Sequence, residues 1–355
     1  MISIREFRVR AIRVPMREPH RTASGTVAES PLILTDILTG NDVTGHSIVF
    51  TYTTAALGPT ADLIRNIGQT IVGEPLAPLD IADKLARRFR LLGTQGLVGM
   101  ALAAIDMAAW DALARHLGLP LCELLGGFPK PVQAYGAVGY DGAAGSASVA
   151  EQWAAQGFKA VKAKIGYPTI REDLEVIKAI RSAVGNDVAI MVDYNQSLTP
   201  TEAIERIRIL ESEGLAWIEE PVLAHDYEGH ARVARQAATP IQCGENWWGP
   251  QDFGHAIAAR ASDYAMLDAM KIGGVTGWMR AAAIAANAGL RVSSHLWPEI
   301  SAHLLSVTPT AHWLEYCDWW NLVIASPLRI ERGTAIAGSA PGSGVEWNED
   351  GIARC

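Results

Sequence analysis

The stretch "FKAVKAKIGYP", residues 158–168, places two lysines inside an otherwise apolar run. If this stretch is a strand, Lys162 and Lys164 leave the same face, because side chains two residues apart on a strand point the same way. The apolar residues around them then point to the opposite face. A lone lysine on such a strand could be a snorkelling or ion-paired residue, so the neighbouring strands decide how the pair is interpreted.

Apolar runs of similar length recur from residue 128 onward, with helical segments between them. Continuous apolar strands separated by helices are typical of a parallel sheet that is covered on both faces, and eight of them indicate a (β/α) barrel. The predicted strands are 131–136, 158–165, 187–194, 215–220, 240–244, 263–268, 290–296 and 311–315. The predicted helices lie near 170–184, 200–213, 227–237, 250–260, 275–288 and 299–306.

The chain has a different texture before residue 128 and loses its regular rhythm after residue 319. The first part mixes period-2 segments with helical segments, which predicts a small α+β unit. The period-2 segments lie at about 2–14, 31–38 and 46–52, and the helical segments at about 59–72, 78–90 and 96–117. We therefore predict a capping domain at 1–127, a barrel at 128–319 and a segment at 320–355 that returns to the capping domain.

Composition excludes several classes of protein. With 355 residues, of which 49% are hydrophobic and 19% charged, the chain resembles an ordinary globular protein with a large core. The formal charge of −8 and the absence of a Lys/Arg-rich run argue against a nucleic-acid partner. The four scattered cysteines fit reduced thiols. Because we find neither a signal peptide nor an apolar run approaching ~18 residues, we expect a cytoplasmic protein without a membrane partner.

Acidic side chains stand at the ends of several predicted strands, and in a barrel these ends meet at one mouth where active sites lie. The separations from Asp193 to Glu219 and from Glu219 to Glu245 are both 26 residues, so the three acids are expected at the same height on consecutive strands. Such a cluster repels itself unless a hard divalent cation binds, and all-oxygen ligands favour Mg²⁺, with Mn²⁺ as a substitute. Any one of these acids alone could instead cap a helix or pair with an arginine. Glu220 faces away from Glu219 by strand alternation and stays outside the ligand set.

The paired lysines fit such a mouth. One lysine could contact a substrate carboxylate while the other removes the α-proton, and we expect burial near cationic neighbours to lower its pKa toward the range of a working base. His295 and Asp268 end neighbouring strands, so the carboxylate could orient the imidazole as a second base, although His295 could also be a buried core histidine. Glu315, on the last strand, either donates a hydrogen bond if it is protonated or accepts an ion pair.

Six ordered motifs resemble the mandelate racemase subgroup of the enolase superfamily, from about residue 4 to the carboxyl terminus. They are "VKAKIG", "VDYNQSL", "WIEEP", "GENWWGP", "DAMKIGGVTGW" and "SSHLWPEISAHLL…TPTAHWLE". The resemblance implies a (β/α)7β barrel under a capping domain built from both chain ends, Mg²⁺ on the three acids and an enolate intermediate.

The resemblance also implies roles for individual residues. It implies that Lys164 is the base for one enantiomer and that His295, held by Asp268, is the base for the other. The implied contacts to the substrate are Lys162 and Glu315 at its carboxylate and Asn195 at its α-hydroxyl.

The segment "REPHRTASGTV", residues 17–27, resembles the mobile flap that closes over the substrate in this family. Where apolar residues would shape a phenyl pocket, this chain has His20, Arg21 and Thr22, and we add Tyr52 to the predicted substrate contacts. Arg21 could pair bidentately with a second carboxylate, or these side chains could face solvent. The loop after the first barrel strand also lacks the serine-containing segment of the family, and both departures argue against mandelate itself.

We expect an isomerase, a racemase that inverts a small 2-hydroxy carboxylate by a two-base mechanism, in a homo-oligomer. The alternative is a lyase, an aldonate or aldarate dehydratase that uses the same residues to form a 2-keto-3-deoxy acid. Asp268 stands where the muconate-lactonizing subgroup has a lysine, which argues against cycloisomerase or dipeptide epimerase chemistry. A third hypothesis is a carboxylate-binding module without turnover.

Overall fold

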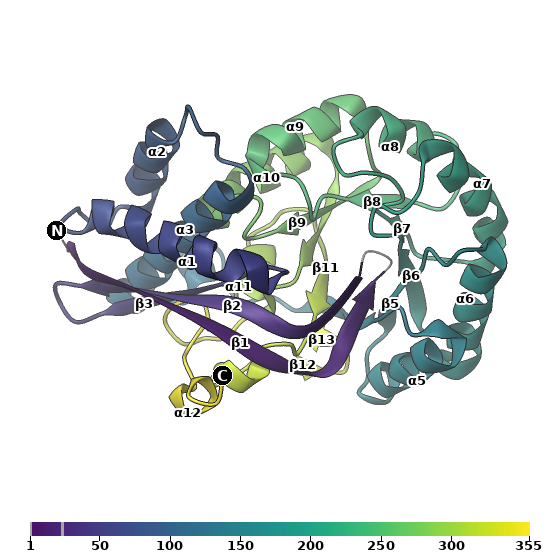
Figure 1. The fold of residues 1–355 in the computed structure, drawn as a ribbon, viewed down its shortest axis with the longest axis horizontal. Coiled ribbons are helices and arrows are strands. Elements are labelled where there is room, and N and C mark those ends of the chain that lie inside the picture. Colours follow the sequence, from purple (N-terminus) through teal and green to yellow (C-terminus); the bar gives the residue numbers. More distant parts are fainter. Residues whose placement is uncertain (1, 23–24) are drawn as a thin grey trace.

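The computed structural model describes residues 2–22 and 25–355 and shows a barrel beside a capping domain (Figure 1). Over these described residues, eight parallel strands close the barrel, because β11 (Ala311–Tyr316) pairs with both β10 and β4 (Val132–Val138). The strands between them are β5 (Ala160–Lys164), β6 (Ala189–Asp193), β7 (Ile218–Glu219), β8 (Ile241–Cys243), β9 (Tyr264–Asp268) and β10 (Arg291–His295).

Helices join the consecutive barrel strands and cover the outside of the barrel (Figure 1). They are α5 (Gly142–Ala155), α6 (Ile170–Val184), α7 (Pro200–Leu210), α8 (Tyr227–Ala234), α9 (Gly249–Ala259), α10 (Gly274–Ala288) and α11 (Pro298–Ser306). This order confirms the predicted (β/α)7β barrel. Sequence analysis missed α5, because its run of small residues, "GAAGSASVAEQWAA", shows no apolar stripe.

The interior of the barrel has two layers. The lower layer is apolar and fully buried, and it consists of Tyr135, Ala160, Met191, Trp217 and Met266. Side chains two residues further along the same strands point into the same interior, one layer higher. Four of these upper positions are charged, namely Lys162, Asp193, Glu219 and Asp268. Strand alternation therefore places the predicted charges directly above an apolar floor.

The capping domain contains a three-stranded antiparallel sheet of β1 (Ile4–Thr22), β2 (Gly25–Thr39) and β3 (Thr44–Phe50). Its helices are α1 (Thr54–Gly68), α2 (Pro78–Arg88), α3 (Gly96–Leu117) and α4 (Leu121–Leu124). β1 and β2 form a long hairpin that reaches from the cap across to the barrel (Figure 1). The sequence underestimated this hairpin, because Pro15 and Pro19 interrupt the alternating pattern and the pairing shifts register between Pro15 and His20.

The final part of the chain returns to the cap, as predicted. It contains η3 (Asn321–Val323), β12 (Ile330–Glu331), β13 (Thr334–Ala335) and α12 (Glu349–Ile352). Trp347 Nε1 donates to Asp36 Oδ1 at 2.6 Å, and Arg10 Nη1 donates to Glu349 Oε2 at 2.7 Å. These contacts confirm a capping domain built from both chain ends, while the exact boundaries at 127 and 319 stay predictions.

Among the described residues, one helix, α3, has the length and apolar composition that a membrane-crossing helix needs. The sequence analysis did not single it out as such. In the structure 78% of its most apolar window is buried inside the protein. Its Asp106 Oδ2 accepts from Thr276 N at 3.0 Å at the start of α10, and its Asp111 Oδ1 accepts from Ser343 N at 2.6 Å in the returning segment. These contacts identify α3 as a core helix that joins the cap to the barrel and to the final segment.

Candidate active site

The two lysines of the opening stretch point together into the barrel mouth. Lys162 Nζ donates to Glu219 Oε1 at 2.5 Å, and Lys164 Nζ donates to Asp193 Oδ2 at 2.5 Å. Both lysines are buried. The shared face predicted from the sequence is therefore present, and the shortest hydrogen bond of each lysine goes to a different acid.

The acids of the predicted metal site, Asp193, Glu219 and Glu245, are all buried and offer ligand atoms that lie within 4.8 Å of one another. Glu219 Oε2 is fixed from below by Trp217 Nε1 at 3.0 Å and by Gln242 Nε2 at 3.1 Å. Glu245 Oε2 is buried and accepts no hydrogen bond from the described residues. A buried acceptor without a donor, in a set of three carboxylates, fits the ligation that Mg²⁺ prefers.

Charge and burial compete strongly in this cluster. Burial raises the pKa of Glu219 well above its ordinary value, despite the ammonium of Lys162. Burial alone would lower the pKa of Lys164, but the Asp193 carboxylate raises it, and the net pKa lies above the usual lysine value. The expectation of a lowered lysine pKa is therefore wrong for the site without its cation, because carboxylates surround Lys164 more closely than cations do.

The surroundings of Glu315 distinguish between the two states considered from the sequence, a protonated donor and an ionised acceptor. Lys162 Nζ lies 2.9 Å from its Oε1, and Leu296 N donates to its Oε2 at 3.1 Å. Burial raises the pKa of Glu315, but Lys162 and then His295 lower it more, to about 2. Glu315 is thus an ionised acceptor of the lysine rather than a protonated donor.

His295 and Asp268 form a buried pair across the mouth from Lys164. The two residues are register partners on β10 and β9, and His295 Nδ1 lies 2.7 Å from Asp268 Oδ2. Asp268 is itself held by the indole of Trp297, whose Nε1 donates to the same oxygen at 3.1 Å. The free imidazole nitrogen, Nε2, lies 3.4 Å from Glu245 Oε2 and therefore faces the acidic cluster. A carboxylate that fixes one nitrogen of an imidazole leaves the other nitrogen available to exchange a proton.

The flap residues have different surroundings. The ring of His20 lies 4.6 Å from the ring of Trp319, and burial, followed by Lys164, lowers the pKa of His20 to about 3. The guanidinium of Arg21 donates to Asp141 Oδ1 at 2.8 Å, and Tyr140 N donates to Arg21 O at 2.9 Å. The side chain of Thr22 lies outside the described residues. His20 is thus neutral, and the charge of Lys164 in the mouth affects its pKa. Arg21 instead forms an ion pair with Asp141 of the barrel domain.

Asn195 and Tyr52, the remaining predicted substrate contacts, border the mouth. The backbone N and side-chain Nδ2 of Asn195 donate to Asp193 at 2.7 and 3.1 Å. Tyr52 has a left-handed backbone with φ 59°, and its side chain packs against Phe50 at 4.7 Å between ring centroids. The roles predicted for these residues stay predictions.

Sequence analysis missed a second row of polar residues behind the metal site. Asn246 Nδ2 donates to both carboxylate oxygens of Glu220 at 2.8 Å, and Lys271 Nζ donates to Asn246 Oδ1. Glu220 and Glu219 accept from different donors, which agrees with the predicted alternation. Asn246 directly follows the acid of "GEN" and Lys271 follows Asp268 in "DAMK", so their position next to strand-end acids was the signal that could have identified them.

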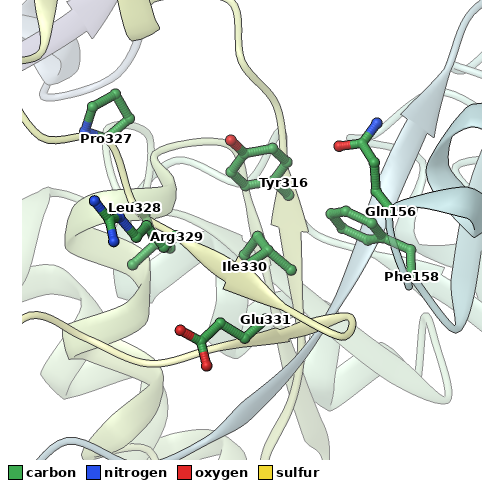
Figure 2. Close-up of a pocket in the computed structure, with 8 residues that line it drawn as sticks. All are labelled: Gln156, Phe158, Tyr316, Pro327, Leu328, Arg329, Ile330 and Glu331. Atoms are coloured by element: carbon green, nitrogen blue, oxygen red, sulfur yellow. The ribbon is translucent and has the colours of Figure 1, made fainter.

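A separate groove of about 360 Å³ lies on the outside of the barrel, beside the returning segment (Figure 2). It is lined by Gln156, Phe158, Tyr316, Pro327, Leu328, Arg329, Ile330 and Glu331. Phe158 and Tyr316 face the strand that carries Ile330 (Figure 2). None of the predicted site residues lines this groove; the acids, the two lysines and His295 gather instead in the barrel mouth, which is the candidate active site.

Comparison with known proteins gives matches along nearly the whole chain. Residues 4–126 match the family described as mandelate racemase / muconate lactonizing enzyme, N-terminal domain, and residues 146–351 match the family described as enolase C-terminal domain-like.

Individual relatives differ in the activities that they are named for. The L-talarate/galactarate dehydratase of Salmonella typhimurium is 32% identical over 292 residues, covering 80% of this chain and 73% of that protein. The D-galactarolactone cycloisomerase of Agrobacterium fabrum is 31% identical over 318 residues, covering 83% of this chain and 84% of that protein.

A crystal structure of an enolase from Bradyrhizobium, complexed with magnesium and mandelic acid, superposes with a TM-score of 0.95. It is 44% identical, and the match covers 99% of this chain and 98% of that one. Together with the buried acidic triad, the magnesium in this neighbour confirms the predicted Mg²⁺ cofactor.

Proposed function

The chain belongs to the mandelate racemase / muconate lactonizing enzyme family of the enolase superfamily, and on that premise we propose that this Mg²⁺-dependent enzyme racemises a 2-hydroxy carboxylate. The observation that carries the proposal is the placement of two bases around the metal site. Lys164 ends β5, and His295 with Asp268 ends β10 and β9, while β6, β7 and the segment after β8 supply the three acids between them. A substrate bound at the acids would therefore have one base on each side of its α-carbon.

Each residue then has a step to perform. Lys162 contacts the substrate carboxylate with its buried ammonium, and Glu315 holds that ammonium in place. Lys164 Nζ takes the α-proton of one enantiomer, and His295 Nε2 returns a proton to the opposite side, with the roles exchanged for the other enantiomer. The chemistry that Mg²⁺ supplies when bound is positive charge beside the substrate carboxylate and beside Asp193, which favours loss of the α-proton and of the Lys164 proton.

The surroundings of the flap favour an aromatic side chain on the substrate over a second carboxylate. His20 and Trp319 form a ring contact, and Phe50 lies between Trp319 and Tyr52, at 6.0 and 4.7 Å between ring centroids. Arg21, which the sequence offered for a second carboxylate, is paired with Asp141 instead. The mandelic acid in the Bradyrhizobium structure supports the same class of substrate.

An acid-sugar dehydratase is the second candidate, and the Salmonella typhimurium relative named L-talarate/galactarate dehydratase favours it. In that reaction Lys164 removes the same proton, and His295 protonates a departing β-hydroxyl instead of the α-carbon. The same residues serve both reactions, so the product separates them.

Proton NMR in D₂O, with the purified protein and Mg²⁺, tests the proposal on mandelate, substituted lactates, and monoacid and diacid sugars. Exchange of the α-proton for deuterium with inversion supports racemisation. Accumulation of a 2-keto acid from a sugar acid shows dehydration instead. Ligand-dependent stabilisation without exchange or product in the whole panel would mean a binding module without turnover.

We further propose that the enzyme is a cytoplasmic homo-oligomer that uses no nucleic-acid or membrane partner and accepts Mn²⁺ in place of Mg²⁺. The charge of −8 supports the absence of a nucleic-acid partner, and the three carboxylates support Mn²⁺ as a substitute. Light scattering of the purified protein tests the oligomeric state.

A further inference from the structure

Two side chains that the proposed reaction does not use, Asn246 and Lys271, connect the metal site to the capping domain. Asn246 Nδ2 donates to Glu245 Oε1 at 3.2 Å, and Asn246 Oδ1 accepts from Lys271 Nζ. The same Nζ lies 4.6 Å from the ring centroid of Tyr52, on the capping domain. A continuous chain of contacts therefore runs from a metal-site acid to the cap.

The orientation of Asn246 in this chain is fixed by chemistry. A lysine ammonium can only donate hydrogen bonds, so the amide oxygen of Asn246 must face Lys271 and its amide nitrogen must face the carboxylates. Glu220 accepts from that nitrogen on both oxygens at 2.8 Å. Because Asn246 is held from both ends, Glu245 receives its hydrogen bond on Oε1, and Glu245 Oε2 is left without a donor among the described residues. That oxygen, which lies 3.4 Å from His295 Nε2, would thus be available as a ligand for a cation.

Lys271 holds its charge in an unusual environment. The residue is 6% exposed, and no described carboxylate forms a salt bridge with its ammonium. An amide oxygen and an aromatic face are its partners instead. The ammonium of Lys271 also stabilises the ionised form of Glu220 without a direct salt bridge. An apolar side chain at this position would lose the contacts to Asn246 and Tyr52 and the electrostatic effect on Glu220.

Tyr52 shows why the cap needs such a contact. Its φ of 59° lies in the left-handed region, which a bulky residue adopts only when the surroundings hold it there. The residue as a whole is 37% exposed, but burial, followed by Asp268 and Glu245, raises the pKa of its hydroxyl well above the ordinary value, so the hydroxyl end of the ring is enclosed near the acids of the mouth. The ring of Phe50 at 4.7 Å and the ammonium of Lys271 at 4.6 Å from its centroid are two described contacts that hold the ring in this conformation.

We propose that Lys271 is a positioning residue that couples Mg²⁺ binding at Glu245 to the seating of Tyr52, and with it the cap, over the barrel mouth. Through Asn246, Lys271 orients the metal-binding carboxylate, and through the Tyr52 ring it fixes the cap. Ordering either end lowers the cost of ordering the other. This inference rests on the Mg²⁺ site of the proposed function and not on the choice between racemisation and dehydration.

Mg²⁺ titration calorimetry of the full chain tests the first half of the proposal. Lys271→Met should weaken Mg²⁺ binding about tenfold or more, the range found when a partner that orients a metal ligand is lost. Lys271→Arg keeps the charge and should retain most of the affinity, and the exposed Lys178→Met is the matched control. Circular dichroism confirms that each variant is folded. Binding by Lys271→Met within about twofold of the parent protein would overturn the proposal.

Hydrogen exchange of the amides at 50–53 tests the second half. In the parent protein, Mg²⁺ should slow exchange there, and in Lys271→Met it should not. If Lys271→Met does not fold, Tyr52→Leu replaces it, since this change removes only the ring end of the chain of contacts and should also weaken Mg²⁺ binding, whereas Tyr52→Phe should not. The coupling would be refuted if Mg²⁺ did not change the exchange rate at 50–53 in the parent protein. It would also be refuted if Tyr52→Leu and Tyr52→Phe bound Mg²⁺ with equal affinity. Neither measurement needs a substrate. A failure of this proposal can therefore be distinguished from a failure of the proposed function, which the NMR experiment tests.

Discussion

The barrel mouth and the β1–β2 hairpin, which we propose border the same substrate space, are built in opposite ways. In the mouth, charged side chains are buried and held by several partners, as Asp268 is by His295, Trp297 and two backbone amides. In the hairpin, Arg21 is 49% exposed and is tied to the barrel by one ion pair and one backbone hydrogen bond.

The difference assigns a separate task to each region. Charges fixed above an apolar floor cannot reorganise, so the mouth determines which bond is broken. A hairpin held to the barrel by few contacts could open and close, and we propose that its side chains contact the variable part of the substrate. Changes in the mouth should therefore abolish the reaction, whereas changes in the hairpin should only alter substrate preference.

The largest effect is expected from Lys164→Met. Loss of a general base costs about 10²–10⁴-fold, so α-deuterium exchange should be lost for one enantiomer while His295 still exchanges the other. NMR of each enantiomer in D₂O measures this directly, and the exposed Lys159→Met is the control. Equal losses for both enantiomers would contradict the assignment of one base to each side.

The next effect concerns the cation itself. In the parent protein, Mg²⁺ at about 100 times its Kd should raise the free energy of unfolding by roughly 2.7 kcal/mol. Asp193→Asn removes one ligand and should eliminate most of this gain, whereas Asp187→Asn, at an exposed acid before β6, should keep it. For each protein, the measured quantity is the free energy of unfolding in Mg²⁺ minus that in a chelator. This difference is needed because loss of a carboxylate also reduces repulsion among the acids and so changes stability without any cation. An Asp193→Asn protein that gains as much from Mg²⁺ as its parent would rule out this residue as a ligand.

The sequence predicted the mouth better than the hairpin for a physical reason. The strand and helix periods fix the positions of strand ends, so a spacing of 26 residues was enough to bring Asp193, Glu219 and Glu245 together. In the hairpin, the period-2 pattern revealed only 2–14 and 31–38, because Pro15 and Pro19 interrupt it toward the tip. The raised pKa of Lys164 and the hydrogen bonds that Asn246 forms depend on which atoms touch; the sequence could point to Asn246 by its place beside Glu245, but not to these contacts. The argument from Asp268 against cycloisomerase chemistry stays a prediction.

A smaller effect is expected at the inner side of the hairpin. If the imidazole of His20 contacts the substrate ring, His20→Val should lower kcat/KM for 4-hydroxymandelate relative to mandelate about fivefold, the value of one neutral hydrogen bond. His20→Phe keeps a ring against Trp319 and separates packing from hydrogen bonding. Because the pKa of His20 is about 3, the imidazole stays neutral and the preference should be the same from about pH 6 to 8. An unchanged ratio in both variants would place the substrate ring elsewhere.

The smallest effect is expected for the ion pair that joins the hairpin to the barrel. Arg21 is 49% and Asp141 19% exposed, and exposed pairs contribute roughly 0.2–1 kcal/mol. Arg21→Gln and Asp141→Asn should therefore each raise KM about two- to fivefold with little change in kcat, and the difference should shrink as salt increases. The double variant should resemble either single variant, because both remove the same contact, while Tyr140 N still reaches the Arg21 carbonyl. Arg65→Gln, at the exposed pair with Asp62 on α1, is the control. A loss much greater for Arg21→Gln than for Asp141→Asn, confined to diacid substrates, would show that Arg21 leaves Asp141 to bind a second carboxylate, and the hairpin would then share the task of the mouth.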